Sequence, residues 1–289
     1  MKHICFLICM LSSILIVLLS CQQEKPQRSF YYWKTTFHLS EIEKQALTDL
    51  HISKLYIRFF DVDWDEAANQ VIPLTEISFA KQIKPKYSIV PVVYIVNRAL
   101  KNSGMPDIPL LASKILREIG HIASQNQIQF NEIQIDCDWS ESTKDKYFKL
   151  LNTIKSQLEK SNITLSATIR LHQVKYKNIT GVPPVDRGML MFYNMGKFSP
   201  APATNSIYNE GDAGKYLSNL SQYPLPLDIA LPAFTWGVQF RKDRVIELLN
   251  NMNRLDFKRN ANFTQIDQNL FTANKFIYYN GLYFIKEDM

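Results

Sequence analysis

The sequence predicts an α/β protein, a TIM-like (β/α)8 barrel. Short apolar runs typical of buried parallel strands alternate with amphipathic stretches typical of helices. Seven strand–helix units of this kind follow one another, as expected for a barrel whose strands are joined by helical crossovers. The chain has 289 residues, 46% of them hydrophobic, which is enough to build one large core.

The predicted strands are short β-branched or aromatic runs bounded by turn residues. They cover 30–33, 54–60, 88–96, 132–138, 164–171, 189–193 and 228–234, with an acidic loop at 61–65 after the second. The first predicted helix runs from a capping box of Ser40 and Glu43 to Leu50. The later predicted helices cover 110–125, 143–160, 213–220 and 243–253.

The eighth strand–helix unit is missing from this pattern. The last apolar stretch, about 276–285, contains Asn280-Gly281 at its centre, which predicts a β-hairpin with a tight turn. We therefore expect a barrel that is incomplete at its eighth unit and is followed by a hairpin. A doubly wound sheet is the alternative architecture.

The N-terminus predicts export and a lipid anchor. Residues 4–19 are apolar except for two serines, a run too short for a comfortable membrane span. It ends in Leu18-Leu19-Ser20-Cys21, which resembles the lipobox of bacterial lipoproteins, where the cysteine is acylated and the peptide is cut before it. The resemblance implies a signal peptide at 1–20, a polar tether at 21–28, a barrel domain at 29–289 and a membrane lipoprotein of the cell envelope. An ordinary secretory signal with an incidental cysteine is the alternative.

Charge and cysteine content narrow the class of partner. The formal net charge is +6, and a cleaved leader containing Lys2 would lower it to about +5, with both signs interspersed. We expect no nucleic acid partner, because proteins that bind nucleic acids concentrate basic residues in a stripe.

If Cys21 carries lipid and Cys5 and Cys9 leave with the leader, only Cys137 remains, so no intramolecular disulfide is available. We expect a monomer.

Two carboxylates form the sharpest chemical signal. Asp136 and Asp138 lie two residues apart at the end of a predicted strand, so their side chains share one face. Paired carboxylates repel, which raises one pKa and prepares an acid–base pair, and barrel enzymes place such groups at strand C-termini. The alternative is that both cap the next helix or bind backbone amides. No phosphate loop and no metal-ligand spacing is visible, so no cofactor and no metal is expected.

These residues resemble part of a known enzyme signature. Asp136-x-Asp138-Trp139 is similar to the Asp-x-Asp-x-Glu motif of chitinase-like, substrate-assisted glycoside hydrolases. The segments 191–194 (Met-Phe-Tyr-Asn) and 231–237 (Leu-Pro-Ala-Phe-Thr-Trp-Gly) resemble that family's sixth and seventh strands. Residues 134–138 (Gln-x-Asp-x-Asp) and 165–168 (Leu-Ser-Ala-Thr) also resemble a group of bacterial exported barrel lipoproteins. The resemblance implies a polysaccharide substrate and acid–base carboxylate chemistry.

The sequence departs from the family at the residue that matters most for hydrolysis. Ser140 stands where the family has the glutamate that protonates the leaving oxygen, and a serine cannot do so near neutral pH. Asn194 stands where the family has an aspartate. An acid would have to come from elsewhere, and the candidates are Asp136, Asp138, Asp61, Asp63 and Glu210.

Aromatic and charged residues near the predicted strand ends complete the candidate site. We expect Asp136 and Asp138 to be catalytic and a further group to contact substrate: Trp33, Arg58, Asp61, Asp63, Trp139, Tyr193, Asn194 and Trp236. Sugar rings stack on aromatic faces, although aromatics also plug barrel tops as core. The sequence thus predicts a glycoside-hydrolase-like protein acting on a polysaccharide. A non-catalytic glycan-binding protein and a structural envelope protein remain the alternatives.

Overall fold

The structure is a computed structural model that describes residues 26–80, 87–196, 198, 205–250 and 252–289. The predicted signal peptide and Cys21 lie outside the described residues. Among the residues that are described, no helix has the length and apolar character needed to cross a bilayer.

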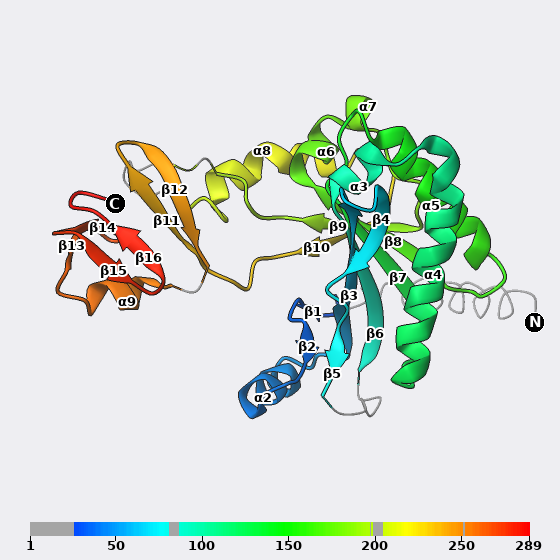
Figure 1. Cartoon of the computed structure of the whole chain (residues 1–289), viewed down its shortest axis with the longest axis horizontal. Coiled ribbons are helices and arrows are strands. Elements are labelled where there is room, and N and C mark those ends of the chain that lie inside the picture. Colours follow the sequence, from blue (N-terminus) through cyan, green and yellow to red (C-terminus); the bar gives the residue numbers. More distant parts are fainter. Residues whose placement is uncertain (1–25, 81–86, 197, 199–204, 251) are drawn as a thin grey trace, which may run out of the picture.

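The main sheet is an incomplete, curled barrel (Figure 1). Its strands are hydrogen-bonded in chain order, β1-β3-β6-β7-β8-β9-β10, and every pair along this path is parallel. The bounds are β1 Ser29–Tyr32, β3 Lys54–Asp65, β6 Ser88–Ile95, β7 Glu132–Cys137, β8 Thr164–Arg170, β9 Arg187–Met191 and β10 Leu227–Ala230. The predicted TIM-like order is confirmed, and β1 and β10 end the path within the described chain, so the barrel stays open.

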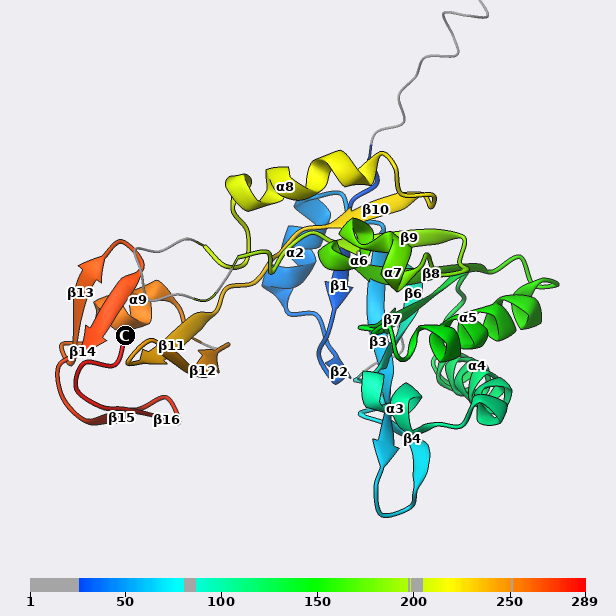
Figure 2. The ribbon, with the colours of Figure 1, turned by 90° about the horizontal axis from the view of Figure 1, so that it is seen from above.

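Helices cover the outer face of this sheet, as Figures 1 and 2 show. The crossover helices are α3 Asn97–Asn102, α4 Ile108–Gln125, α5 Lys144–Leu158, α6 Leu171–Lys175, α7 Lys177–Thr180 and α8 Glu210–Leu220, with a 3-10 turn η1 at Met105–Asp107. The predicted capping box is present, since Ser40 and Glu43 exchange hydrogen bonds at the start of α2, Glu41–Asp49. A small parallel pair, β2 Thr36–Phe37 and β5 Ser78–Phe79, lies beside the sheet.

The second barrel strand is longer than the sequence predicts. β3 runs through Asp65 and turns back into β4, Gln70–Leu74, so the expected acidic loop at 61–65 is wrong. Antiparallel pairing from Asp61↔Leu74 to Asp65↔Gln70 holds these acidic residues in strand geometry. The sequence argument missed this hairpin because the acidic residues have low strand propensity and only pairing with β4 offsets it.

Three antiparallel hairpins follow β10 and form what we call the C-terminal module, residues 237–289. They are β11 Gly237–Arg241 with β12 Arg244–Leu249, β13 Phe263–Asp267 with β14 Leu270–Ala273, and β15 Ile277–Tyr279 with β16 Leu282–Phe284, and α9 Arg254–Lys258 lies among them. The last hairpin is confirmed, with Asn280 and Gly281 at φ 53° and 83° as a tight two-residue turn requires.

The helix predicted at 243–253 is wrong. Lys242 and Asp243 adopt φ 48° and 64°, which closes a two-residue turn between β11 and β12. Apolar residues of this module pack on one another as a separate cluster that includes Leu249, Phe263 and Phe284.

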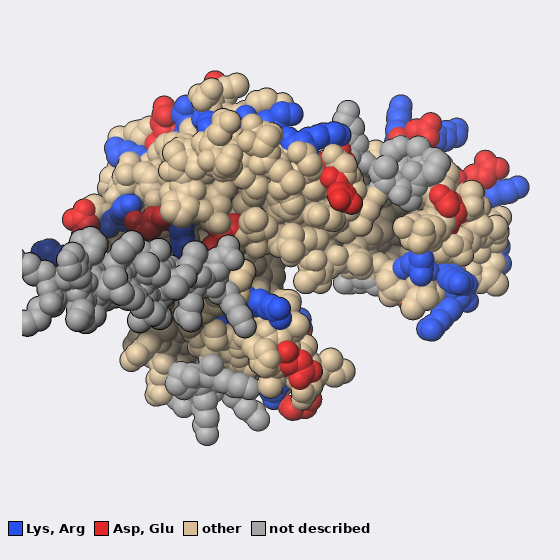
Figure 3. All heavy atoms as spheres, turned by 180° about the vertical axis from the view of Figure 1, so that it is seen from behind, with Lys and Arg blue, Asp and Glu red and all other residues tan. Residues whose placement is uncertain are grey.

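The two faces of the barrel sheet differ in chemistry. The outer face carries a continuous apolar core under α4 and α5, with Ile135 and Leu165 fully buried. The inner face is mostly polar, and its smaller apolar cluster includes Tyr56 and Met189. On the surface shown in Figure 3, charged side chains of both signs are scattered among uncharged residues. Barrel enzymes carry their sites at the carboxyl ends of the parallel strands. The candidate site is therefore the polar inner face at this end of the barrel, which we call the mouth.

Candidate active site

Strand β7 supplies a column of polar side chains to the barrel interior. Glu132, Gln134 and Asp136 alternate with residues of the outer apolar core, and all three are almost fully buried. Asp138 follows directly after the strand and continues the same phase. The expectation that the two aspartates share one face therefore holds, with Asp136 inside the barrel and Asp138 at its mouth.

Arg170, at the end of β8, joins the two aspartates. Its guanidinium makes a bidentate ion pair with Asp138, with Nε bonded to Oδ1 and Nη2 lying 3.2 Å from Oδ2. The same Nη2 lies 3.8 Å from Asp136 Oδ1, and Thr168 donates a hydrogen bond of 2.5 Å to that oxygen. One arginine thus offsets the repulsion between two neighbouring carboxylates.

The two carboxylates differ in exposure. Burial raises the pKa of Asp136, against the opposing effects of Arg170 and of the Thr168 hydrogen bond. The Asp136 side chain is 6% exposed, whereas that of Asp138 is 50% exposed. A ligand at the mouth would therefore meet Asp138 first, with Asp136 behind it.

A β-bulge in β3 sends Asp61 to the same mouth. The register between β3 and β6 shifts between Arg58 and Phe60, so that Asp61 pairs with Tyr94. Phe60 belongs to the outer core, whereas without the bulge it would follow Arg58 on the inner face. Arg58 Nε lies 3.4 Å from Asp61 Oδ1. This ion contact is not a hydrogen bond, and Asp61 Oδ1 accepts none from the described residues.

Aromatic side chains stand beside these charges. Trp33 is 41% exposed, and the Arg58 guanidinium lies 5.5 Å from its ring centroid. Trp33 also makes edge contacts with Tyr94 and Tyr31, at 6.4 and 6.2 Å between ring centroids. Trp33 and Arg58 are thus placed at the mouth, where the sequence expects them.

The residues expected on the sixth and seventh strands lie on the side of the mouth next to the C-terminal module. Burial raises the pKa of Tyr193, which makes an edge contact of 5.5 Å with Phe234. Asn194 is exposed with φ 55° and donates its backbone N–H to Ile207. Trp236 packs on Phe234, at 5.4 Å between centroids.

Two expected substrate-binding residues are not brought to the mouth. Trp139 is 2% exposed, stacks on Tyr147 of α5 and donates its Nε1–H to the Thr180 carbonyl, so it belongs to the outer core. The Asp63 carboxylate is held by Arg98 through bonds of 2.6 and 2.5 Å, and this pairing lowers its pKa. Trp139 follows the end of β7 in sequence but turns to the helix side.

Ser140 occupies the position of the family's acid without replacing it. Its hydroxyl lies within 3.0 Å of Ser142 and 3.2 Å of Thr143, and 3.4 Å from Asn97 Nδ2. These contacts place it among loop residues between the ends of β6 and β7, at the start of α5. Position 140 therefore carries a hydroxyl where the resembled motif has a carboxyl.

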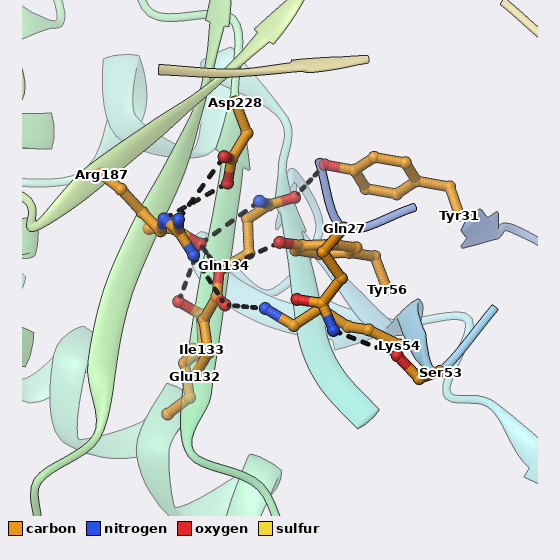
Figure 4. A network of polar contacts seen from close by, with 11 residues as sticks. Gln27, Tyr31, Ser53, Lys54, Tyr56, Glu132, Ile133, Gln134, Arg187 and Asp228 are labelled. Atoms are coloured by element: carbon orange, nitrogen blue, oxygen red, sulfur yellow. Dashed lines mark hydrogen bonds and ion pairs between the residues drawn. The ribbon is translucent and has the colours of Figure 1, made fainter. Parts of the chain in front are cut away.

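A second polar network lies inside the barrel near the amino-terminal ends of β3, β7 and β9, and Figure 4 shows its side chains. Glu132 accepts from Lys54 at 2.9 Å, Ser166 at 2.7 Å and Tyr56 at 3.3 Å. Arg187 lies 3.9 Å from the same carboxylate and pairs with Asp228 on β10. Sequence reasoning did not single out these residues. The available signal was the alternation of Glu132, Gln134, Asp136 and Asp138 with apolar residues, a polar face where a barrel interior is usually apolar.

A cavity beside the C-terminal module lies away from these carboxylates. It has a volume of about 500 Å³ between the 205–207 segment, Trp236 and the C-terminal module, and none of the mouth aspartates lines it. We place the candidate site at the mouth because charge and exposed aromatics converge there. In the described part of the chain, no group of three or more His, Cys, Asp or Glu residues could hold a metal ion.

Comparison with known proteins identifies the fold. The spore cortex-lytic enzyme SleL of Bacillus cereus is similar with a TM-score of 0.50 and 16% identity, covering 78% of this chain and 55% of the enzyme. A GH18 chitinase from Cycas revoluta, solved with (GlcNAc)4, is similar with a TM-score of 0.51 and 11% identity, covering 74% of this chain and 70% of the chitinase. The chain has a chitinase-like glycoside hydrolase fold.

The comparisons by sequence found no match. No protein-family model matches the chain, and no curated protein matches its sequence. The chain spans 55% of the length of the spore enzyme, and identities this low show the fold alone. Function has to be argued from the mouth itself.

Proposed function

We propose that the protein acts on a polysaccharide at the barrel mouth by carboxylate acid–base chemistry. The observation that carries this proposal is the convergence of Asp136, Asp138 and Asp61 with Arg170 and the exposed Trp33 at one end of a glycoside-hydrolase-like barrel. Barrel enzymes build their sites from residues at the ends of several strands, and these five come from four. Support for the substrate class comes from the Cycas revoluta chitinase, which was solved with an N-acetylglucosamine tetramer.

Each group has a chemical role in this proposal. Asp138, half exposed and oriented by Arg170, accepts hydrogen bonds from sugar hydroxyl or amide groups at the mouth. Asp136 lies behind it and keeps the local charge negative when ionised, which stabilises the positive charge that develops on the sugar ring. Trp33 presents a ring face to the sugar, and Tyr193 borders the opposite side of the mouth.

The second candidate function is glycan binding without turnover. One observation favours it: Ser140 stands where the family's acid would be, and its hydroxyl is engaged with Ser142 and Thr143. A mouth that binds a sugar but has no group able to protonate the leaving oxygen would hold its ligand unchanged.

Binding and hydrolysis assays on one set of proteins separate these two functions. The chain from Gln22 onward is tested on N-acetylglucosamine oligomers and on a panel of cell-wall glycans, by calorimetry and by product analysis. We expect turnover that Asp138→Asn abolishes, and roughly fivefold weaker binding by Trp33→Ala because one stacked aromatic contributes about 1 kcal/mol. The control is Tyr278→Ala, which removes a 59% exposed aromatic from the C-terminal module. Binding without turnover in the parent protein would establish the second candidate.

We also propose that the chain is anchored to a membrane of the cell envelope through lipid on Cys21. The support is the sequence Leu18-Leu19-Ser20-Cys21, because lipidation requires a thiol at this position. Expression in a bacterial host with a radiolabelled fatty acid should label the full chain and place it in the membrane fraction. Cys21→Ser should remove the label and release the protein, whereas unchanged labelling would contradict the anchor.

A further inference from the structure

The bulge in β3 is the only reason that Asp61 reaches the barrel mouth. Lys54, Tyr56 and Arg58 alternate onto the inner face, and a regular strand would place Phe60 there next. The shift of register after Arg58 turns Phe60 into the outer core and Asp61 inward. Bulges are frequent beside active sites, where they re-aim a side chain. The bulge therefore points an acidic side chain, and not an aromatic one, into the barrel at this place.

The surroundings of Asp61 suit an acid that keeps its proton. Its side chain is 17% exposed, and its buried Oδ1 accepts no hydrogen bond from the described residues. Burial raises its pKa, the nearby Asp63 adds to this, and Arg58 opposes it. On the neighbouring strands, Tyr94 of β6 is its register partner and the Asp136 carboxyl of β7 is repelled by it, while Trp33 contacts both Arg58 and Tyr94.

The spacing of Asp61 from the other carboxylates also fits. Asp61, Tyr94 and Asp136 lie in one register row across β3, β6 and β7. Neighbouring strands are about 4.8 Å apart, so the backbones of the two aspartates lie roughly 10 Å apart. Inward-pointing side chains on a curled sheet converge, which brings the carboxyl groups toward the range of about 5–9.5 Å found in glycoside hydrolases.

We propose that Asp61 is the proton donor of this site and takes the role that Ser140 cannot perform. This inference rests on the proposed polysaccharide hydrolysis. The Asp61 carboxyl gives its proton to the glycosidic oxygen as the bond between that oxygen and the anomeric carbon breaks, and the bonding electrons stay with the oxygen. Water then supplies a hydroxyl to the anomeric carbon, and its proton returns to the Asp61 carboxylate. One water is consumed and the carboxyl is restored.

The test compares Asp61→Asn with Asp65→Asn on the chain from Gln22 onward. Asp65 lies on the same strand, and its carboxylate accepts hydrogen bonds from the backbone of Ala67 and Ala68 at the hairpin tip, so its amide variant is a matched control. We expect Asp61→Asn to lower turnover of N-acetylglucosamine oligomers on the order of 100-fold or more, as for loss of a general acid. Turnover of a dinitrophenyl glycoside, whose leaving group needs no proton, should change by only a few-fold. Equal losses on both substrates, or no loss on either, would overturn the assignment.

A titration decides the assignment even where the parent protein shows no turnover. Carbon-13 spectra of aspartate-labelled protein, with Asp61→Asn to identify the signal, should show the Asp61 carboxyl titrating above the ordinary range of an aspartate, because burial raises its pKa. Titration near the ordinary value of about 4 would overturn the proposal. Absence of hydrolysis by the parent protein, with Asp61 titrating high, would refute the proposed hydrolysis and leave Asp61 as a protonated carboxyl that donates a hydrogen bond to a bound glycan.

Discussion

Replacement of Glu132 tests whether the polar network inside the barrel stabilises the fold. Glu132 is 3% exposed and accepts from Lys54 at 2.9 Å, Ser166 at 2.7 Å and Tyr56 at 3.3 Å. Glu132→Ala would leave the Lys54 ammonium, whose side chain is 14% exposed, without its carboxylate. Removal of one partner from a buried ion pair costs about 3–5 kcal/mol, and we expect a loss in this range in the free energy of unfolding.

The assay is urea unfolding of the chain from Gln22 onward, followed by fluorescence and by circular dichroism. Glu132→Gln keeps the hydrogen-bond acceptor but not the charge, so its loss should be smaller than that of Glu132→Ala. Glu41→Ala removes an exposed partner of Lys44 on α2 and should leave the midpoint unchanged. A loss below about 1 kcal/mol for Glu132→Ala would refute the argument that this carboxylate holds the interior together.

Three further predictions concern single side chains. Asp136→Asn should raise the free energy of unfolding at neutral pH. Burial raises the pKa of Asp136 in the folded chain, so ionisation of this carboxyl costs stability as the pH rises above about 4, the ordinary value of an aspartate. Unfolding measured over a pH series should show that the gain vanishes below that pH. Trp139→Ala should lower the free energy of unfolding by about 3–5 kcal/mol but leave glycan affinity unchanged, since Trp139 is buried on the helix side. Gly188→Val should lower the midpoint of thermal unfolding by several degrees, because even a Cβ there would lie 2.4 Å from Ile169 Cδ1. An unchanged midpoint would contradict the tight packing of β8 on β9.

The sequence could predict the barrel strands because their apolar periodicity is strong. The seven parallel strands, the capping box at Ser40 and the turn at Asn280-Gly281 all follow from local rules. The hairpin of β11 and β12 could not be predicted in this way. Its turn uses Lys242 and Asp243 with positive φ, which local preference does not favour, so the segment resembles an amphipathic helix.

The candidate site was predictable where strand alternation alone decides the facing of a residue. Asp136, Asp138, Trp33 and Arg58 lie where alternation and strand ends place them. Asp61 reaches the mouth through a bulge, which has no reliable sequence signal. The same alternation places Trp139 on the outer face together with Cys137, where it stacks on Tyr147 of α5, so its expected role in binding substrate did not follow from strand geometry.

The two ends of the C-terminal module lie side by side. Phe240 and Met289 exchange backbone hydrogen bonds of 2.6 and 3.0 Å, and the Asp288 carboxylate binds Arg241 and Gln239 near the start of the module. A segment whose ends meet can be grafted into a loop at little entropic cost, because it leaves the ends of that loop close together. During evolution such a module can be exchanged for another without altering the strand register beneath it. New neighbours for the barrel mouth can thus be recruited as whole units.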